Sequence, residues 1–139
     1  KMPSELTTDS PNFTLFIYQP SKNESELCQT AKISDPNCSG PRLGLAIEIE
    51  IENQTGLKEL LKEWERTMVS DLRPLILAEI QETEMTGFQD NSEPKYQNAT
   101  IRYENLPISP IALNYGFVDN LLIIATSKYS LYQALDSFK

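Results

Sequence analysis

The chain has 139 residues, of which 40% are hydrophobic and 23% charged, and its formal net charge is −8 at pH 7. This length fits one domain with a real hydrophobic core, but not a second full domain. The acidic balance, with no cluster of Lys and Arg, argues against a nucleic-acid partner and against binding to anionic lipids. The absence of histidine excludes Ser-His and Cys-His nucleophile pairs and the commonest zinc sites.

The ends of the chain predict a piece cut from a longer protein. Residues 1–11 have no periodicity and are expected to be a linker or a frayed end, followed by a single domain over residues 12–139. No apolar run reaches the roughly 20 residues that span a bilayer, and no signal peptide is visible. An anchor or a signal would therefore lie upstream of Lys1, and direct membrane insertion by this segment is not expected.

The first predicted strand, Asn12–Gln19, is followed by a polar loop over residues 21–41 that holds Cys28 and Cys38. Two cysteines in one short loop predict a disulfide, the alternative being two unrelated reduced thiols. A disulfide would place the domain in an oxidising compartment.

Sequons of the form Asn-x-Ser/Thr are more frequent than chance predicts. The excess fits secretion in a eukaryote, and it fits equally well a bacterial chain rich in Asn and Ser. The five are Asn12, Asn23, Asn37, Asn53 and Asn98.

The segment Leu43–Glu52 carries the clearest strand pattern in the chain. Its odd-numbered positions are large and aliphatic, and its even-numbered positions are small or acidic. Such alternation predicts a strand with one face on the core and one in water, which favours antiparallel pairing.

A helix is predicted from a cap at Asn53 or Thr55 to about Ser70. Pro74 would end this helix or start a short second one. The buried stripe at helical spacing comprises Leu57, Leu60, Leu61, Trp64, Met68 and Leu72.

The middle of the chain predicts two shorter strands, Thr86–Asp90 and Ala99–Asn105, joined by a turn-rich loop over Asn91–Asn98. In the second strand, Ile101 and Tyr103 share one face, while Arg102 and Glu104 share the other. The apolar segment Leu75–Ile80 before them is too brief to assign to a helix or a strand.

The C-terminal unit is the most informative part of the sequence. Ile111–Val118 predicts a strand, Asp119-Asn120 a two-residue turn, and Leu121–Thr126 a second strand that is apolar on both faces and thus central. Ser127 then caps a helix whose apolar side comprises Leu131, Ala134, Leu135 and Phe138.

The predicted order is therefore β-β-α-β-β-β-β-α. It implies an α+β two-layer sandwich, with a mostly antiparallel sheet of about five to six strands and two helices on one face.

Four segments, read in order, resemble a bacterial family of extracytoplasmic, usually membrane-anchored proteins catalogued only as a domain of unknown function. The segments are RLGLAIEIEIEN, LKELLKEWERTM, IRYENLP and NYGFVDNLLIIATSKYSLYQALD. Modules of that family have a strand of the type F-x-L-x-x-E, a helix, and later Y-x-x-V-D/N-x-x-L-V-I-x-T/S-S, which Phe117–Ser127 matches. The resemblance covers Leu43 to Lys139 and implies an anchored location outside the cytoplasm. It carries over no catalytic or binding residue, and the cysteine loop is not a general feature of the family.

Two groups of acidic and amide side chains are candidate sites. Glu48, Glu50 and Glu52 would project from one strand face about 6.5–7 Å apart, as a cation site or a glycosidase-like pair. The alternative is a solvated face balanced by Arg102 or Lys95. Oxygen-bearing side chains that suit calcium also follow one another in the middle loop, where turn formation explains them equally. They are Asp90, Asn91, Glu93 and Asn98.

Aromatic residues offer further candidates. Trp64 would anchor an interface or, in its helical stripe, pack in the core. The six tyrosines would line a groove for sugar or peptide, or form edges of the core. They are Tyr18, Tyr96, Tyr103, Tyr115, Tyr129 and Tyr132.

No motif assigns a catalytic, cofactor-binding or metal-binding residue. The leading hypothesis is a non-enzymatic module of an anchored, extracytoplasmic envelope protein, with a protein or cell-envelope partner. The alternatives are a carrier of a small hydrophobic ligand, held between sheet and helices, and a carboxylate-dependent glycan hydrolase. The carrier would need a cavity that Trp64, Phe88, Phe117 and Leu135 leave open.

Overall fold

The elements follow one another in the predicted order. The computed structural model describes residues 13–19, 41–49, 54–76, 87–96, 98–106 and 111–137. The strands are β1 (Phe13–Tyr18), β2 (Arg42–Glu48), β3 (Gln89–Asp90), β4 (Thr100–Asn105), β5 (Ala112–Val118) and β6 (Leu121–Ala125). The helices are α2 (Gln54–Trp64), α3 (Met68–Asp71), α4 (Arg73–Ile76), the 3-10 turn η5 (Pro94–Tyr96) and α5 (Lys128–Ser137).

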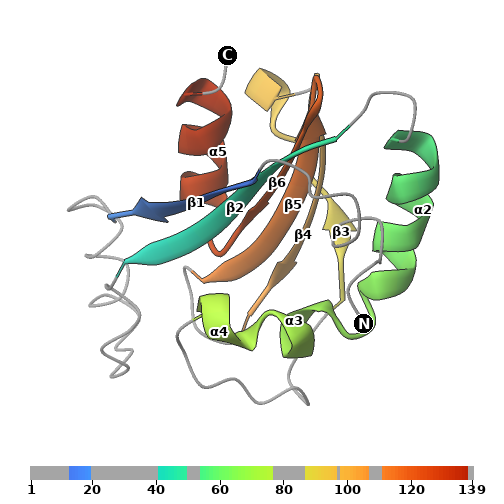
Figure 1. The fold of residues 1–139 in the computed structure, drawn as a ribbon, viewed down its shortest axis with the longest axis horizontal. Helices are drawn as coiled ribbons and strands as arrows, with labels where there is room; N and C mark the ends of the chain where they lie inside the picture. The colour runs from blue at the N-terminus through green and yellow to red at the C-terminus, as the bar shows by residue number, and fades with distance from the viewer. Residues whose placement is uncertain are drawn as a thin grey trace.

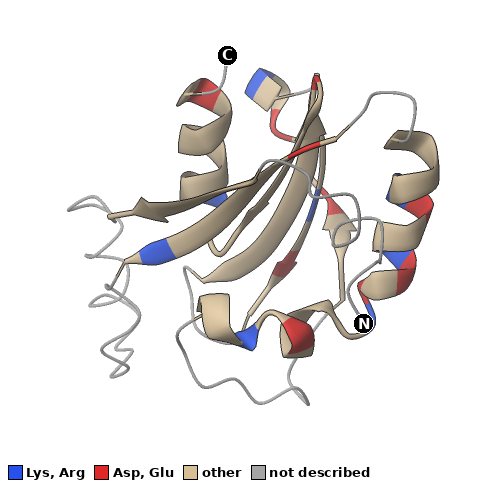
Figure 2. Ribbon diagram, in the orientation of Figure 1, with Lys and Arg blue, Asp and Glu red and all other residues tan. Residues whose placement is uncertain are grey.

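The six strands form one antiparallel sheet in the order β1-β2-β6-β5-β4-β3 (Figure 1). The predicted α+β class is therefore confirmed, with six strands and two helices of seven or more residues. The strand predicted to be central, β6, does lie between β2 and β5. Neither β5 nor β6 carries a charged residue, whereas charges follow α2 along its length (Figure 2).

The prediction that both helices cover one face of the sheet is wrong. Leu122 and Ile124 of β6 pack in one cluster with residues of α2, α3 and α4. Ile123 and Ala125 pack in a second cluster with Leu131 of α5. Successive residues of a strand point to opposite faces, so these clusters lie on opposite sides of the sheet. A central strand that is apolar on both faces needs cover on both, and the result is three layers.

The predicted alternation of buried and exposed residues in β2 is correct for one face of the strand and wrong for the other. Leu45, Ile47 and Ile49 face the α2 side, but the other face is not open to water, because Ala46 packs in the α5 cluster. Gly44 lets the Phe16 ring of β1 pack on that face, since a Cβ at position 44 would lie 2.2 Å from Cζ of Phe16 and would displace the ring. On β1, which forms one edge of the sheet, Phe13, Leu15 and Ile17 remain exposed.

The first long helix ends at Trp64 rather than near Ser70. The indole N–H of Trp64 donates to Asp71 Oδ2 at 2.7 Å, and the N–H of Thr67 donates to the Trp64 carbonyl at 2.9 Å. This turn redirects the chain, so that Met68 and later apolar residues continue the buried stripe in α3 and α4. Of the two alternatives at Pro74, the structure shows the short further helix, α4, which begins at Arg73.

The C-terminal unit forms as predicted. Asp119 occupies the left-handed region with a φ of 50° in the turn between β5 and β6. The hydroxyl of Ser127 accepts a hydrogen bond from the N–H of Ser130 at 3.1 Å, which caps α5. These local signals were sufficient because each acts within four residues.

Several predictions fall outside the described residues. They concern the linker 1–11, most of the loop 21–41 with Cys28 and Cys38, and the residues Glu50, Glu52, Asn53 and Phe138. Of the predicted strand Thr86–Asp90, the described part begins at Gly87, and β3 covers Gln89–Asp90. Within the described ranges, no helix is long and apolar enough to cross a bilayer.

Candidate functional site

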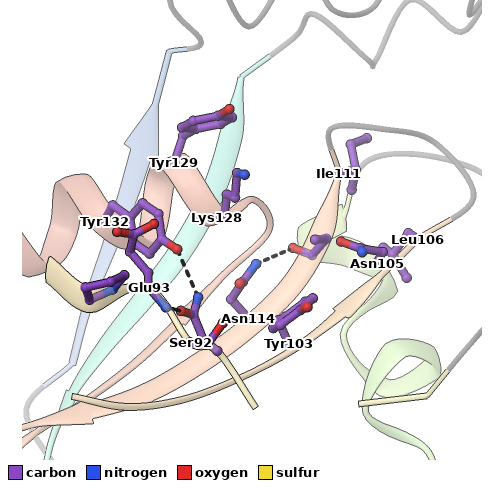
Figure 3. Close-up of a pocket in the computed structure, with 13 residues that line it drawn as sticks. Ser92, Glu93, Tyr103, Asn105, Leu106, Ile111, Asn114, Lys128, Tyr129 and Tyr132 are labelled. Carbon is purple, nitrogen blue, oxygen red and sulfur yellow. Dashed lines mark hydrogen bonds between the residues drawn. The ribbon is translucent and has the colours of Figure 1, made fainter. Parts of the chain in front are cut away.

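A cleft of about 620 Å³ opens on the α5 side of the sheet (Figure 3). The ends of β4 and β5 form its floor. The segment 91–94 and the first half of α5 form its walls. Its volume falls in the range of roughly 300–1,000 Å³ that is typical of small-molecule sites.

Strand register brings the floor residues of β4 and β5 together and sets them beside β6. Tyr103 on β4 lies opposite Asn114 on β5, and Asn114 lies opposite Ala125 on β6. Asn105 and Ala112 form the next row that faces the same side. Two-residue periodicity explains why all these side chains share the face of α5.

Asn114 is the polar centre of this floor. It is fully buried, and its Nδ2 donates to the carbonyl oxygen of Ala112 at 2.9 Å. Since a carbonyl oxygen only accepts, the amide nitrogen must face Ala112, which fixes the orientation of Oδ1. Among the described residues, Oδ1 has no hydrogen-bond partner. A buried acceptor without a hydrogen bond lowers the free energy of unfolding by about 1–3 kcal/mol.

The wall formed by the segment 91–94 is tied to α5 through Asn91. Its Nδ2 donates to the hydroxyl of Tyr132 at 2.9 Å, and its Oδ1 accepts the N–H of Glu93 at 2.7 Å. Tyr132 also stacks on Tyr96, with 4.3 Å between the ring centroids and an interplanar angle of 16°. The cleft therefore has a fixed shape on this side before any ligand arrives.

Charge is confined to the rim of the cleft. Lys128 and Glu93 are both exposed, and the Nζ of Lys128 lies 5.1 Å from the centroid of the Tyr129 ring. The other described side chains that line the cleft are uncharged. The interior can thus form hydrogen bonds and aromatic contacts, but it offers no buried counter-charge to an ion.

The oxygen-rich loop serves as a turn. Asn91 accepts the N–H of Glu93, as described, and Asp90 pairs with Arg102, with 3.0 Å between Oδ1 and Nη1. Nowhere in the described ranges do three metal-binding side chains gather. Asn91 and Glu93 nevertheless line the cleft, so the loop contributes to a site of another kind.

The other predicted candidates fall in different places. Trp64 is buried in the core, and Glu48 is exposed at the end of β2. The two residues predicted to balance the glutamates pair elsewhere: Lys95 with Asp136, and Arg102 with Glu65. Three tyrosines line the cleft, namely Tyr103, Tyr129 and Tyr132.

Sequence reasoning missed Asn114 and Asn105. The available signal was a lone amide inside the apolar strand ALNYGFV. A polar side chain at a buried strand position needs a partner, and this one marks the cleft.

A polar network lies on the opposite face of the sheet. Arg102 donates to both carboxylate oxygens of Glu65, from Nε at 2.6 Å and from Nη2 at 2.8 Å. The hydroxyl of Tyr115 donates to Glu65 Oε1 at 2.5 Å. Burial, the bond to Glu65 and the charge of Glu65 together raise the pKa of Tyr115.

Glu104, in the same region, has a raised pKa. Burial is the main cause and the negative charge of Glu65 adds to it, while the bond from the Gly87 N–H to Oε1, at 3.0 Å, opposes both. The folded protein then binds more protons than the unfolded chain between the two pKa values, so stability falls as pH rises through that window.

Glu104→Gln should remove this dependence, because its amide oxygen can still accept the Gly87 bond. We expect the melting temperature to rise at about pH 7 and to change little at about pH 4. Thermal melts of both proteins across this range measure the effect. An equal shift at both values would contradict it.

The chain matches no protein-family model, no curated protein and no solved structure. Its cleft is therefore interpreted from its own chemistry.

Proposed function

We propose that this domain is a non-enzymatic binding module of an anchored, extracytoplasmic envelope protein, and that the cleft on the α5 side holds its ligand. The observation that carries the proposal is the buried amide of Asn114, whose oxygen has no partner in the described part of the chain. A ligand that donates to this oxygen would recover its cost.

The chemistry of the lining favours a polar ligand over a hydrophobic one. The carrier alternative needs space between sheet and helices, but Trp64, Phe117 and Leu135 are buried and packed in the two clusters. The glycan-hydrolase alternative needs two carboxyl groups roughly 5–10 Å apart around the substrate. Among the described residues that line the cleft, Glu93 alone carries a carboxylate, and it is exposed.

The proposed location rests on sequence features. They are the resemblance of Phe117–Ser127 to anchored extracytoplasmic modules and the pair Cys28 and Cys38 in one short loop. We propose that these cysteines form a disulfide, which persists in oxidising compartments.

The disulfide can be tested by mass and by melting. Protein isolated from its own compartment should weigh about two mass units less than the reduced sequence. Reduction should lower the melting temperature without unfolding the domain. The loop connects β1 and β2, and these two strands pair with each other directly. A reduced mass in freshly isolated protein would contradict the proposal.

The binding proposal is tested by NMR titration of the isotope-labelled protein with four probes: cellobiose, trialanine, citrate and spermidine. They present hydroxyl, peptide, anionic and cationic chemistry in turn. We expect at least one to shift resonances of Asn114, Tyr129 and the segment 91–94 while leaving the α2 side unchanged. The proposal fails if none of the four shifts the cleft.

A further inference from the structure

We propose that the ligand of this cleft is a neutral saccharide, with one hydroxyl donating to Asn114 Oδ1 and a sugar face lying against a tyrosine ring. This inference rests on the proposed binding function and names the class of its ligand.

The first requirement on the ligand is a hydrogen-bond donor. The Nδ2 of Asn114 is occupied by the Ala112 carbonyl, so the group that the described residues leave unsatisfied is the acceptor Oδ1. An amide oxygen accepts from O–H or N–H groups and gains nothing from a carboxylate or a phosphate oxygen. A sugar hydroxyl supplies such a donor without a charge.

The second requirement is neutrality. An ion that enters the cleft leaves its hydration, and the floor made by Tyr103, Asn114 and Ala112 returns no opposite charge. The two charges at the rim, Lys128 and Glu93, have opposite sign and remain in solvent. Together these two side chains favour neither anions nor cations. They can form hydrogen bonds with hydroxyl groups at the edge of the ligand.

The third requirement is a ligand with both donors and acceptors beside apolar C–H groups. Asn105, Ser92 and the tyrosine hydroxyls can each donate and accept, which matches a ring of hydroxyl groups. Tyr103 and Tyr129 are half-buried and contribute one ring from the floor and one from the α5 wall. A pyranose has polar edges and an apolar C–H face, so it can bond to the polar side chains of the cleft and pack on a tyrosine ring at the same time.

The size and rigidity of the cleft agree with this class. A volume of about 620 Å³ exceeds that of a single sugar ring and leaves room for a second. The bonds of Asn91 to Tyr132 and to Glu93 fix one wall in advance. A wall that is ordered before binding loses little conformational entropy when the ligand arrives, which favours binding of a weak ligand such as a saccharide.

The test compares saccharides with the other probe classes and then removes the acceptor. Cellobiose, maltose and N,N′-diacetylchitobiose are titrated by calorimetry and NMR, beside trialanine, citrate and spermidine. We expect at least one saccharide to bind and to shift the Asn114 side-chain amide. Asn114→Leu should weaken that binding about tenfold or more, since it removes the acceptor and keeps most of the volume.

The matched control is Gln133→Leu, which removes an amide from an exposed position of α5 outside the cleft. It should bind the saccharide as the parent does. Asn114→Leu should also melt within a few degrees of the parent, because the apolar side chain removes an unsatisfied buried oxygen. If Asn114→Leu does not fold, Tyr129→Ala provides the test, with an expected loss of about tenfold that Tyr129→Phe partly restores.

The outcomes separate the two proposals. Cleft binding of trialanine, citrate or spermidine without any saccharide overturns the ligand class and leaves the binding module intact. Equal saccharide affinity in the parent and both cleft variants overturns the assigned site. Binding of no probe at all overturns both proposals.

Discussion

Replacing Ile124 by aspartate is expected to unfold the domain. Ile124 is fully buried in the central strand β6 and packs in the cluster beneath α2, α3 and α4. A carboxylate at this position would lose its hydration without gaining a partner. The cost should exceed about 4 kcal/mol, which is comparable with the whole stability of a small domain. Leu122→Asp, in the same strand and cluster, should behave alike.

The same substitution on β1 provides the matched control. Ile17 is also a strand isoleucine, but it is 69% exposed at the edge of the sheet. Ile17→Asp should therefore leave folding intact. Circular dichroism melts and NMR dispersion of the three variants measure the difference. A cooperative, parent-like melt of Ile124→Asp would show that β6 is not the core of the sheet.

Removing Glu65 is expected to give the second largest loss. Its carboxylate accepts two bonds from Arg102 and one from Tyr115, and the side chains of Arg102 and Glu65 are only 19% and 13% exposed. Glu65→Ala would leave the guanidinium and the hydroxyl without this partner in a part-buried place. Breaking such a pair costs about 3–5 kcal/mol, which corresponds to a fall of roughly 10 °C or more in melting temperature.

Asp90 offers a control on the same arginine. It also pairs with Arg102, but its side chain is 83% exposed, so solvent screens the interaction. Asp90→Ala should shift the melting temperature by less than about 4 °C. Comparable losses for Asp90→Ala and Glu65→Ala would contradict a special role for the bidentate pair. Urea unfolding of both variants distinguishes these outcomes.

Local sequence signals predicted the strands, the turn at Asp119 and the cap at Ser127, because each signal acts between near neighbours. They did not predict the end of α2, where Trp64 bonds to Asp71 across a turn. The layer arrangement was missed although its signal was present, since a strand that is apolar on both faces demands cover on both.

The cleft depended on information that a single sequence does not display. Tyr103 meets Asn114 only through the register of β4 on β5, and Tyr132 meets Asn91 only after α5 docks. The sequence offers six tyrosines for a groove, but no local signal groups the three that line the cleft or excludes Tyr115, which points to the other face. Asn114 alone could have been found, as a polar residue in an apolar strand.

The position of β6 has a consequence for the time course of folding. The strand in the middle of the sheet is the last strand in the sequence, and its neighbour β2 lies about eighty residues earlier, with Gly44 opposite Ala125. A growing chain would hold the β1–β2 hairpin without its partner until β6 had been made, whereas β4, β5, β6 and α5 are consecutive and can associate quickly. Cooperative closure therefore awaits the C-terminal third of this sequence, and until then the apolar face of β2 needs protection from other chains.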